Sequence, residues 1–191
     1  MSAPTEATAA LPLTVVLIGM MGSGKSTVGR ALSTHTGWRY MDNDELVGLV
    51  TGRASEEIDA TDGEAVLHEA EAEALRHVLT IAPPLIVGAA AWVVIHPPSV
   101  ELLRAQPSVV YLRARPETLR ARIGAGERRR DDATDIEWLR ARSAERDETY
   151  REIATIVIDT DDLDAEAIVA QLLTDLYGRQ RGRRFGGDAP G

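Results

Sequence analysis

Residues 19–27 have the types and spacing of a phosphate-binding loop. The sequence Gly19-Met20-Met21-Gly22-Ser23-Gly24-Lys25-Ser26 fits the pattern G-x-x-x-x-G-K-[ST], and it lies between a short apolar run and a helical pattern. Glycines let such a loop curl with its N–H groups pointing inward, and the N-terminus of the next helix attracts anions. Lys25 would reach the β and γ phosphates as a catalytic group, and Ser26 would give its hydroxyl to Mg2+. We therefore predict that the phosphates of a nucleoside triphosphate, with Mg2+, bind at Gly22, Ser23, Gly24, Lys25, Ser26 and Thr27.

Two aspartates follow the next apolar run, in the order Tyr40-Met41-Asp42-Asn43-Asp44. Residues at the carboxyl end of a parallel strand lie at the edge of the sheet where ligands bind. Asp42 could hold the hydrated Mg2+, and Asp44 could hold or deprotonate a substrate hydroxyl. The alternative is that one of them caps the following helix. With a phosphate loop in the same chain, we favour the functional interpretation.

Short apolar runs alternate with helical patterns through most of the chain. The apolar runs cover residues 13–18, 38–41, 85–87, 109–112 and 155–158. The helical patterns cover residues 26–36, 64–79, 116–123, 135–154 and 164–177. Uninterrupted apolar runs suit strands that are covered on both faces. The alternation therefore predicts an α/β fold with a parallel sheet.

Composition narrows the class of protein. The chain has 191 residues, a net charge of −9 and no cysteine. The acidic balance argues against a nucleic-acid-binding protein, and the lack of cysteine excludes disulfides and thiolate metal sites. No apolar stretch reaches the roughly 20 residues of a membrane helix. We expect one domain over residues 13–177, between a flexible N-terminus (1–12) and a disordered tail (178–191), in a cytoplasmic monomer whose partner is a small molecule rather than nucleic acid or a membrane.

The motifs together resemble the shikimate kinase family over residues 13–175. The matching text is GMMGSGKSTVGRAL, DND, Thr51-Gly52-Arg53, Ala60-Thr61-Asp62-Gly63-Glu64 and Val109-Val110-Tyr111-Leu112. The resemblance implies a three-layer P-loop kinase fold, in which helices flank a five-stranded parallel sheet. It also implies a mobile lid and ATP as the phosphate donor.

The resemblance also implies roles for individual residues. The first aspartate of the family's pair, here Asp42, lies near Mg2+, and the second, Asp44, holds the hydroxyl groups of the substrate. A family arginine that precedes the tyrosine of a late helix binds the substrate carboxylate, and Arg146 matches it. Gly88 and His68 fall at two further substrate-binding positions. The catalytic lid arginine falls within Arg128, Arg129 and Arg130.

The chain departs from the family on the side of the phosphate acceptor. It has Leu67-His68 where the family has Phe-Arg, and that Arg grips the shikimate carboxylate. It has Gly88-Ala89-Ala90 in place of three glycines, Asp59 in place of a pocket Phe, and Arg130-Asp131-Asp132-Ala133 in place of Arg-Pro-Leu-Leu. Glu71, which partners the missing arginine, remains. Because a histidine cannot form the bidentate fork of an arginine, we predict that shikimate binds weakly.

Three functions fit these residues. The first is an ATP-dependent kinase that phosphorylates a hydroxyl of shikimate, and the second is a related kinase whose acceptor is another polyol or cyclitol. The third is a non-catalytic nucleotide-binding protein whose acceptor site has decayed. The intact Lys25, Ser26, Asp42 and Asp44 favour an enzyme, a phosphotransferase with an alcohol group as acceptor. No N-K-x-D sequence is present, which disfavours a GTPase.

Overall fold

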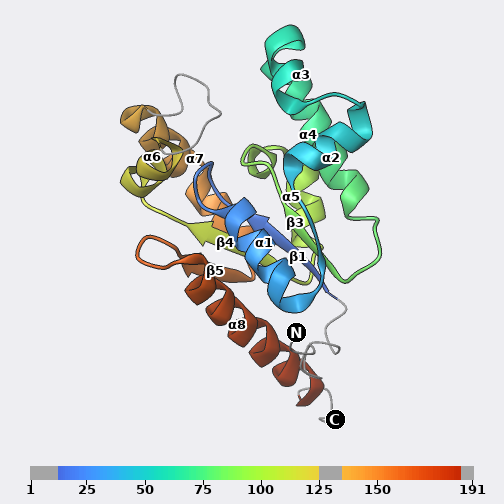
Figure 1. Ribbon diagram of the computed structural model, residues 1–191, viewed down its shortest axis with the longest axis vertical. Coiled ribbons are helices and arrows are strands. Elements are labelled where there is room, and N and C mark those ends of the chain that lie inside the picture. Colours follow the sequence, from blue (N-terminus) through green and yellow to red (C-terminus); the bar gives the residue numbers. More distant parts are fainter. Residues whose placement is uncertain (1–12, 125–134, 186–191) are drawn as a thin grey trace.

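Five parallel strands form the centre of the protein, in the order β2-β3-β1-β4-β5 (Figure 1). The computed structural model describes residues 13–124 and 135–185. The strands are β1 (Thr14–Ile18), β2 (Arg39–Met41), β3 (Leu85–Gly88), β4 (Val109–Arg113) and β5 (Ile156–Asp159). Each strand lies within one residue of a predicted apolar run. The structure therefore confirms the predicted five-stranded parallel sheet.

Helices were predicted less completely than strands. The prediction is confirmed for α1 (Lys25–Thr36), α4 (Glu64–Val78), α6 (Pro116–Gly124), α7 (Ile136–Ile153) and the start of α8 (Ala165–Phe185). The structure adds α2 (Asn43–Thr51), α3 (Ser55–Asp62), the 3-10 turn η2 (Val93–Ile95) and α5 (Pro97–Arg104). These additions are short. A short helix shows few turns of apolar periodicity, and the two prolines that open α5 read as a break although the first helical turn tolerates proline.

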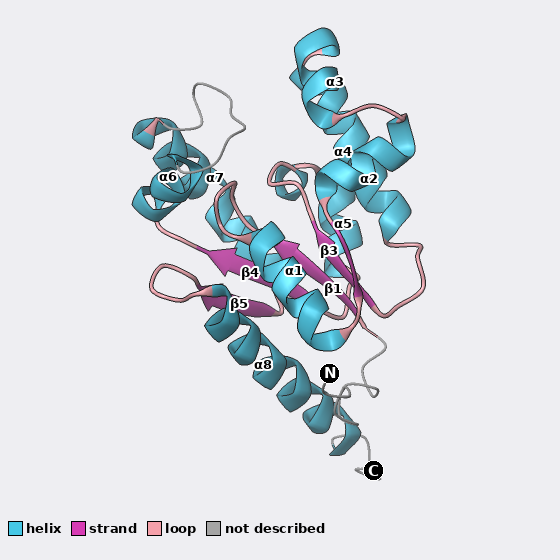
Figure 2. Ribbon diagram, viewed as in Figure 1, coloured by secondary structure: helices cyan, strands magenta, loops and turns pink. Residues whose placement is uncertain are grey.

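The sheet lies between two layers of helices (Figure 2). Along β1 the side chains alternate between these layers, as the twofold period of a strand requires. Val15 and Leu17 pack in one apolar cluster with α1 and α8, and Val16 and Ile18 pack in a second cluster with residues of α2 to α7. All four side chains are fully buried. This double burial explains why the run has no polar alternation.

Arg53 fixes α3 to the loop that precedes it. The Arg53 guanidinium lies 2.9 Å from Glu57 Oε1 and 2.5 Å from Asp62 Oδ2, and it donates to Thr61 Oγ1 at 2.6 Å. These contacts join two of the segments that carry the family resemblance. They also fix the helix that carries Asp59.

The last helix is longer than expected. Helix α8 runs to Phe185, so the prediction of a disordered tail from Gly178 is wrong for residues 178–185. Arginine and glutamine are good helix formers, and these residues contain no proline that would end the helix. Neither α8 nor any other helix in the described ranges has an apolar stretch long enough to cross a membrane.

Two helical glycines differ sharply in the space around them. A Cβ on Gly29 in α1 would lie 2.2 to 2.7 Å from three atoms of the Tyr40 ring, whereas a Cβ on Gly48 in α2 would have Arg53 O as its nearest neighbour, at 3.9 Å. We predict that Gly29→Ala lowers the free energy of unfolding by about 1–3 kcal/mol because it overpacks the contact with Tyr40. Gly48→Ala should raise it by about 0.5–1 kcal/mol through helix propensity. Denaturant melts of both variants would test this, and equal effects would contradict the packing argument.

Candidate active site

The loop between β1 and α1 is curled by glycines. Gly19, Gly22 and Gly24 have φ values of +145°, +80° and +97°. At Gly19 a side chain is also excluded by space, because a Cβ would lie 2.6 Å from Leu112 O and 2.8 Å from Ser23 Oγ. The Ser23 N–H donates to Met20 O at 3.1 Å, which closes the turn. Ser23 Oγ is buried without a hydrogen-bond partner among the described residues.

Lys25 lies across this loop. Its Nζ donates to Gly19 O at 2.9 Å and to Met20 O at 3.0 Å. Burial lowers the pKa of Lys25 to about 8, although the negative charges of Asp42, Glu71 and Asp44 oppose that shift. The ammonium is therefore positioned before any phosphate arrives, and it faces three carboxylates.

Asp42 begins α2 and also meets the phosphate loop. Its Oδ1 accepts from the N–H of Asn43 at 2.8 Å, so the capping role considered from the sequence is confirmed. Its Oδ2 accepts from the Tyr40 hydroxyl at 2.9 Å and lies 3.8 Å from Arg30 Nη2. Burial, followed by the charge of Asp42, raises the pKa of Tyr40. Capping leaves Oδ2 facing Tyr40, so the cap does not exclude a second role for Asp42.

The phosphate loop and the two aspartates line one cleft of about 1190 Å³. The cleft lies where β1, β2 and β3 end. Gly22, Ser23, Gly24, Lys25, Ser26 and Thr27 line it together with Asp42 and Asp44. Helix α4 contributes Leu67, His68 and Glu71, and α3 contributes Asp59. Residues predicted from separate motifs thus meet at one place.

Arg146 is a buried cation at the far end of this cleft. Only 9% of its side chain is exposed. Its Nη1 donates to Ala91 O at 3.2 Å, and its Nε is buried without a hydrogen-bond partner among the described residues. The Tyr150 hydroxyl donates to the same carbonyl at 3.0 Å. Arg146 lines the cleft, so its guanidinium places a positive charge beside any ligand there.

Gly88 and the lid arginines are the predicted positions that the described lining of the cleft does not include. Gly88 is buried, and a Cβ there would lie 2.6 Å from the Tyr40 hydroxyl oxygen. Gly88 is not among the residues that line the cleft, and Ala89, Ala90 and Ala91 line it instead. Tyr40 therefore excludes a side chain at this position, and the contact of Gly88 with a substrate stays a prediction. Arg128, Arg129 and Arg130, with the expected lid, lie outside the described residues.

Sequence reasoning missed an aromatic stack beside the acceptor side of the cleft. The ring of His68 stacks on Trp92 with centroids 4.2 Å apart, and Trp92 stacks on His96 at 5.0 Å. His68 also lies 3.6 Å from Glu64. The spacing of these residues in the sequence gives no helical or strand period that would bring them together. His68 therefore lies beside a flat aromatic surface, where the family has an arginine.

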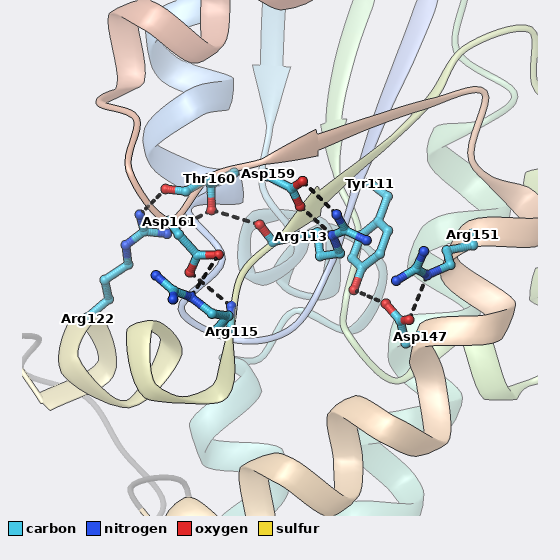
Figure 3. A network of polar contacts seen from close by, with 9 residues as sticks. All are labelled: Tyr111, Arg113, Arg115, Arg122, Asp147, Arg151, Asp159, Thr160 and Asp161. Carbon is cyan, nitrogen blue, oxygen red and sulfur yellow. Dashed lines mark hydrogen bonds and ion pairs between the residues drawn. The ribbon is translucent and has the colours of Figure 1, made fainter.

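The other end of the cleft is bordered by Arg122, which a polar network holds in place (Figure 3). Arg122 donates to Oγ1 of the fully buried Thr160 at 2.9 Å and to its carbonyl oxygen at 2.5 Å. The Thr160 N–H donates to Arg113 O at 2.8 Å, and the guanidinium of Arg113 pairs with Asp159. These contacts span 38 to 47 residues along the chain, so no local pattern predicts them.

Comparison with known proteins agrees with this geometry. The family model described as shikimate kinase matches residues 21–177. The shikimate kinase of Moorella thermoacetica is 37% identical over 167 residues, which cover 85% of this chain and 93% of that protein. The shikimate kinase of Mycobacterium avium is 36% identical, with coverage of 84% and 92%. The solved shikimate kinase from Acinetobacter baumannii, in complex with shikimate, superposes with a TM-score of 0.79 at 26% identity, covering 91% of this chain and 97% of that one. Because these matches extend over nearly the whole fold, the chain belongs to the shikimate kinase family.

Proposed function

We propose that this protein is an ATP- and Mg2+-dependent kinase that transfers the γ-phosphate of ATP to a hydroxyl of shikimate or a related small polyol. The observation that carries the proposal is that Lys25 and Asp44 line one cleft. A cation for the phosphates and a carboxylate for the hydroxyl are the two groups that phosphoryl transfer requires from the protein.

The phosphate loop fits a triphosphate. Its positive-φ glycines expose a concave backbone, and α1 begins at Lys25 with its N-terminus toward the loop. Lys25 would exchange its two carbonyl partners for the β and γ phosphates.

Ser26 and Asp42 fit the requirements of Mg2+. The described residues hold no cluster of three or more His, Cys, Asp or Glu side chains placed for a metal. Mg2+ commonly takes one or two protein oxygens, phosphate oxygens and water, so a hydroxyl and one carboxylate suffice. The bound metal would neutralise charge on the phosphates.

Asp44 is placed to act on the acceptor. It lies in the first turn of α2, exposed and lining the cleft. Asp44 would hold the acceptor hydroxyl and take its proton as that oxygen bonds to the γ phosphorus. The bond from the γ phosphorus to the β,γ-bridging oxygen breaks, and the electron pair leaves with ADP. Arg146 would donate to an oxygen of the acceptor.

The pKa of Lys25 predicts how nucleotide affinity depends on pH. Lys25 is charged below about pH 8, and bound phosphate keeps it charged. The affinity for ATP should therefore fall as the pH rises above 8, by up to about tenfold per pH unit. Calorimetric titrations from pH 7.5 to 9.5 would measure this. Lys25→Arg should bind more weakly but lose the dependence, because a guanidinium stays charged. The same pH dependence in both proteins would contradict the assignment.

Asp44→Asn separates chemistry from nucleotide binding. We expect transfer to the acceptor to fall by about 10²–10⁴-fold, with the affinity for ATP nearly unchanged. Glu45→Gln makes the same charge change on the next residue, which is exposed and outside the cleft, and should leave transfer intact. If Asp44→Asn loses ATP affinity as well, Asp44 serves the metal or the fold.

Restoring the family residues should improve the use of shikimate. Leu67→Phe with His68→Arg should raise kcat/KM for shikimate by at least about tenfold, because a charge-assisted hydrogen bond contributes about 1.5–3 kcal/mol. Adding Asp59→Phe and Ala89→Gly should raise it further, though not additively, because these residues share one cleft. His77→Arg makes the same exchange at an exposed position of α4 outside the cleft and serves as a control. Efficient use of shikimate by the wild type, or no rescue, would refute this account.

A further inference from the structure

Glu71 is a carboxylate on the acceptor side of the cleft that has lost its family partner. It lines the cleft from α4 and is half-buried. Among the residues that the structure describes, one hydrogen bond reaches it, from Asn43 Nδ2 to Glu71 Oε1 at 3.2 Å. A carboxylate can accept about four hydrogen bonds. Most of its accepting capacity is therefore available to a molecule in the cleft.

The charged groups near Glu71 do not replace the two N–H donors that an arginine guanidinium would offer its carboxylate. Lys25 and Arg146 lower its pKa and Asp44 raises it, and the hydrogen bond that it accepts within the described ranges comes from the uncharged amide of Asn43. His68, one turn earlier on α4, stacks on Trp92 and lies near Glu64. Burial is the largest effect and raises the pKa of Glu71 to about 7, which is the behaviour of a carboxyl group short of partners.

We propose that Glu71 accepts a hydrogen bond from a hydroxyl of the phosphate acceptor itself, so that this enzyme favours uncharged polyols over acceptors that carry a carboxylate. The proposal rests on the kinase function proposed above. In the family, the corresponding glutamate pairs with an arginine. Here we assign Glu71 a direct contact with the acceptor instead.

Arg146 is compatible with an uncharged acceptor. Arg146 lines the cleft, and a guanidinium can donate to a hydroxyl oxygen as well as to a carboxylate. A hydroxyl can accept from Arg146 and donate to Glu71 at the same time, because it has both a proton and lone pairs. Above about pH 7, where Glu71 is ionised, an acceptor carboxylate beside it adds like-charge repulsion that a single arginine must offset. The two groups of opposite sign that line this cleft thus favour a hydroxyl.

The stacked ring of Trp92 supports the same class of acceptor. Trp92 lines the cleft and presents its ring together with that of His68, at an interplanar angle of 10°. His68 and His96 both stack on the Trp92 ring, so the stack forms an aromatic wall of the cleft where the family has an arginine.

A matched pair of acceptors tests the inference. Shikimate and the primary alcohol obtained by reducing its carboxyl group share the same ring hydroxyls but differ at one substituent. We expect the wild type to use the alcohol with at least a tenfold higher kcat/KM than shikimate, with the difference in KM. Glu71→Gln should remove most of that preference by raising the KM of the alcohol more than the KM of shikimate. Because the charge of Glu71 also acts on Lys25, the affinity for ATP is measured separately, and any change in it should be the same with both acceptors. Glu73→Gln, an exposed α4 residue paired with Arg76, is the matched control and should keep the preference.

Binding of both compounds should also be measured by calorimetry with a non-hydrolysable ATP analogue present. This makes the inference independent of turnover. A preference for the alcohol in binding without any transfer would support the inference and refute the kinase function. Tighter binding of shikimate by the wild type, or an equal effect of Glu71→Gln on both compounds, would overturn the inference.

Discussion

The ammonium of Lys25 is the group around which the site is organised. It is held by the carbonyls of Gly19 and Met20 at the point where β1 turns into α1, and burial brings its pKa down to about 8. An amine so placed needs negative charge nearby, and Asp42, Asp44 and Glu71 supply it from two other helices. The P-loop, the end of β2 and helix α4 must therefore converge on one cleft. The order of strands in the sheet, with β3 between β1 and β2, makes this convergence possible.

The two ends of the cleft follow different rules. At the nucleotide end, packing and hydrogen bonds fix the positions of the groups. Glycines curl the loop, and Tyr40 packs against Gly29 and Gly88. Thr160 holds Arg122 through two hydrogen bonds. At the acceptor end the chemistry is a balance of charges. Arg146 remains, the second family arginine is absent, and Glu71 keeps a single amide partner within the described chain. We infer that the first end preserves the phosphate donor while the second sets the acceptor.

Much of this could be predicted from the sequence, and the misses have physical reasons. The strands were predictable because side chains buried on both faces leave uninterrupted apolar runs, as in Val15 to Ile18. Asp42 and Asp44 were predictable because parallel strands end at one edge. The stack of His68 on Trp92 and the contact of Arg122 with Thr160 join segments that are distant in the sequence. No local pattern of residues therefore predicts them. The close approach of Gly88 to the Tyr40 hydroxyl could not be predicted either, because the two residues lie on different strands.

The most direct test of the central claim is to follow the γ-phosphate. ATP labelled at that phosphate should be mixed with the protein, Mg2+ and a panel of polyols that includes shikimate, and the products separated. If Lys25 and Asp44 serve one reaction in one cleft, the label will appear in a phosphate ester of at least one polyol, at a rate far above its release as inorganic phosphate. Label that remains in ATP, or that appears as inorganic phosphate with every polyol, would contradict the claim.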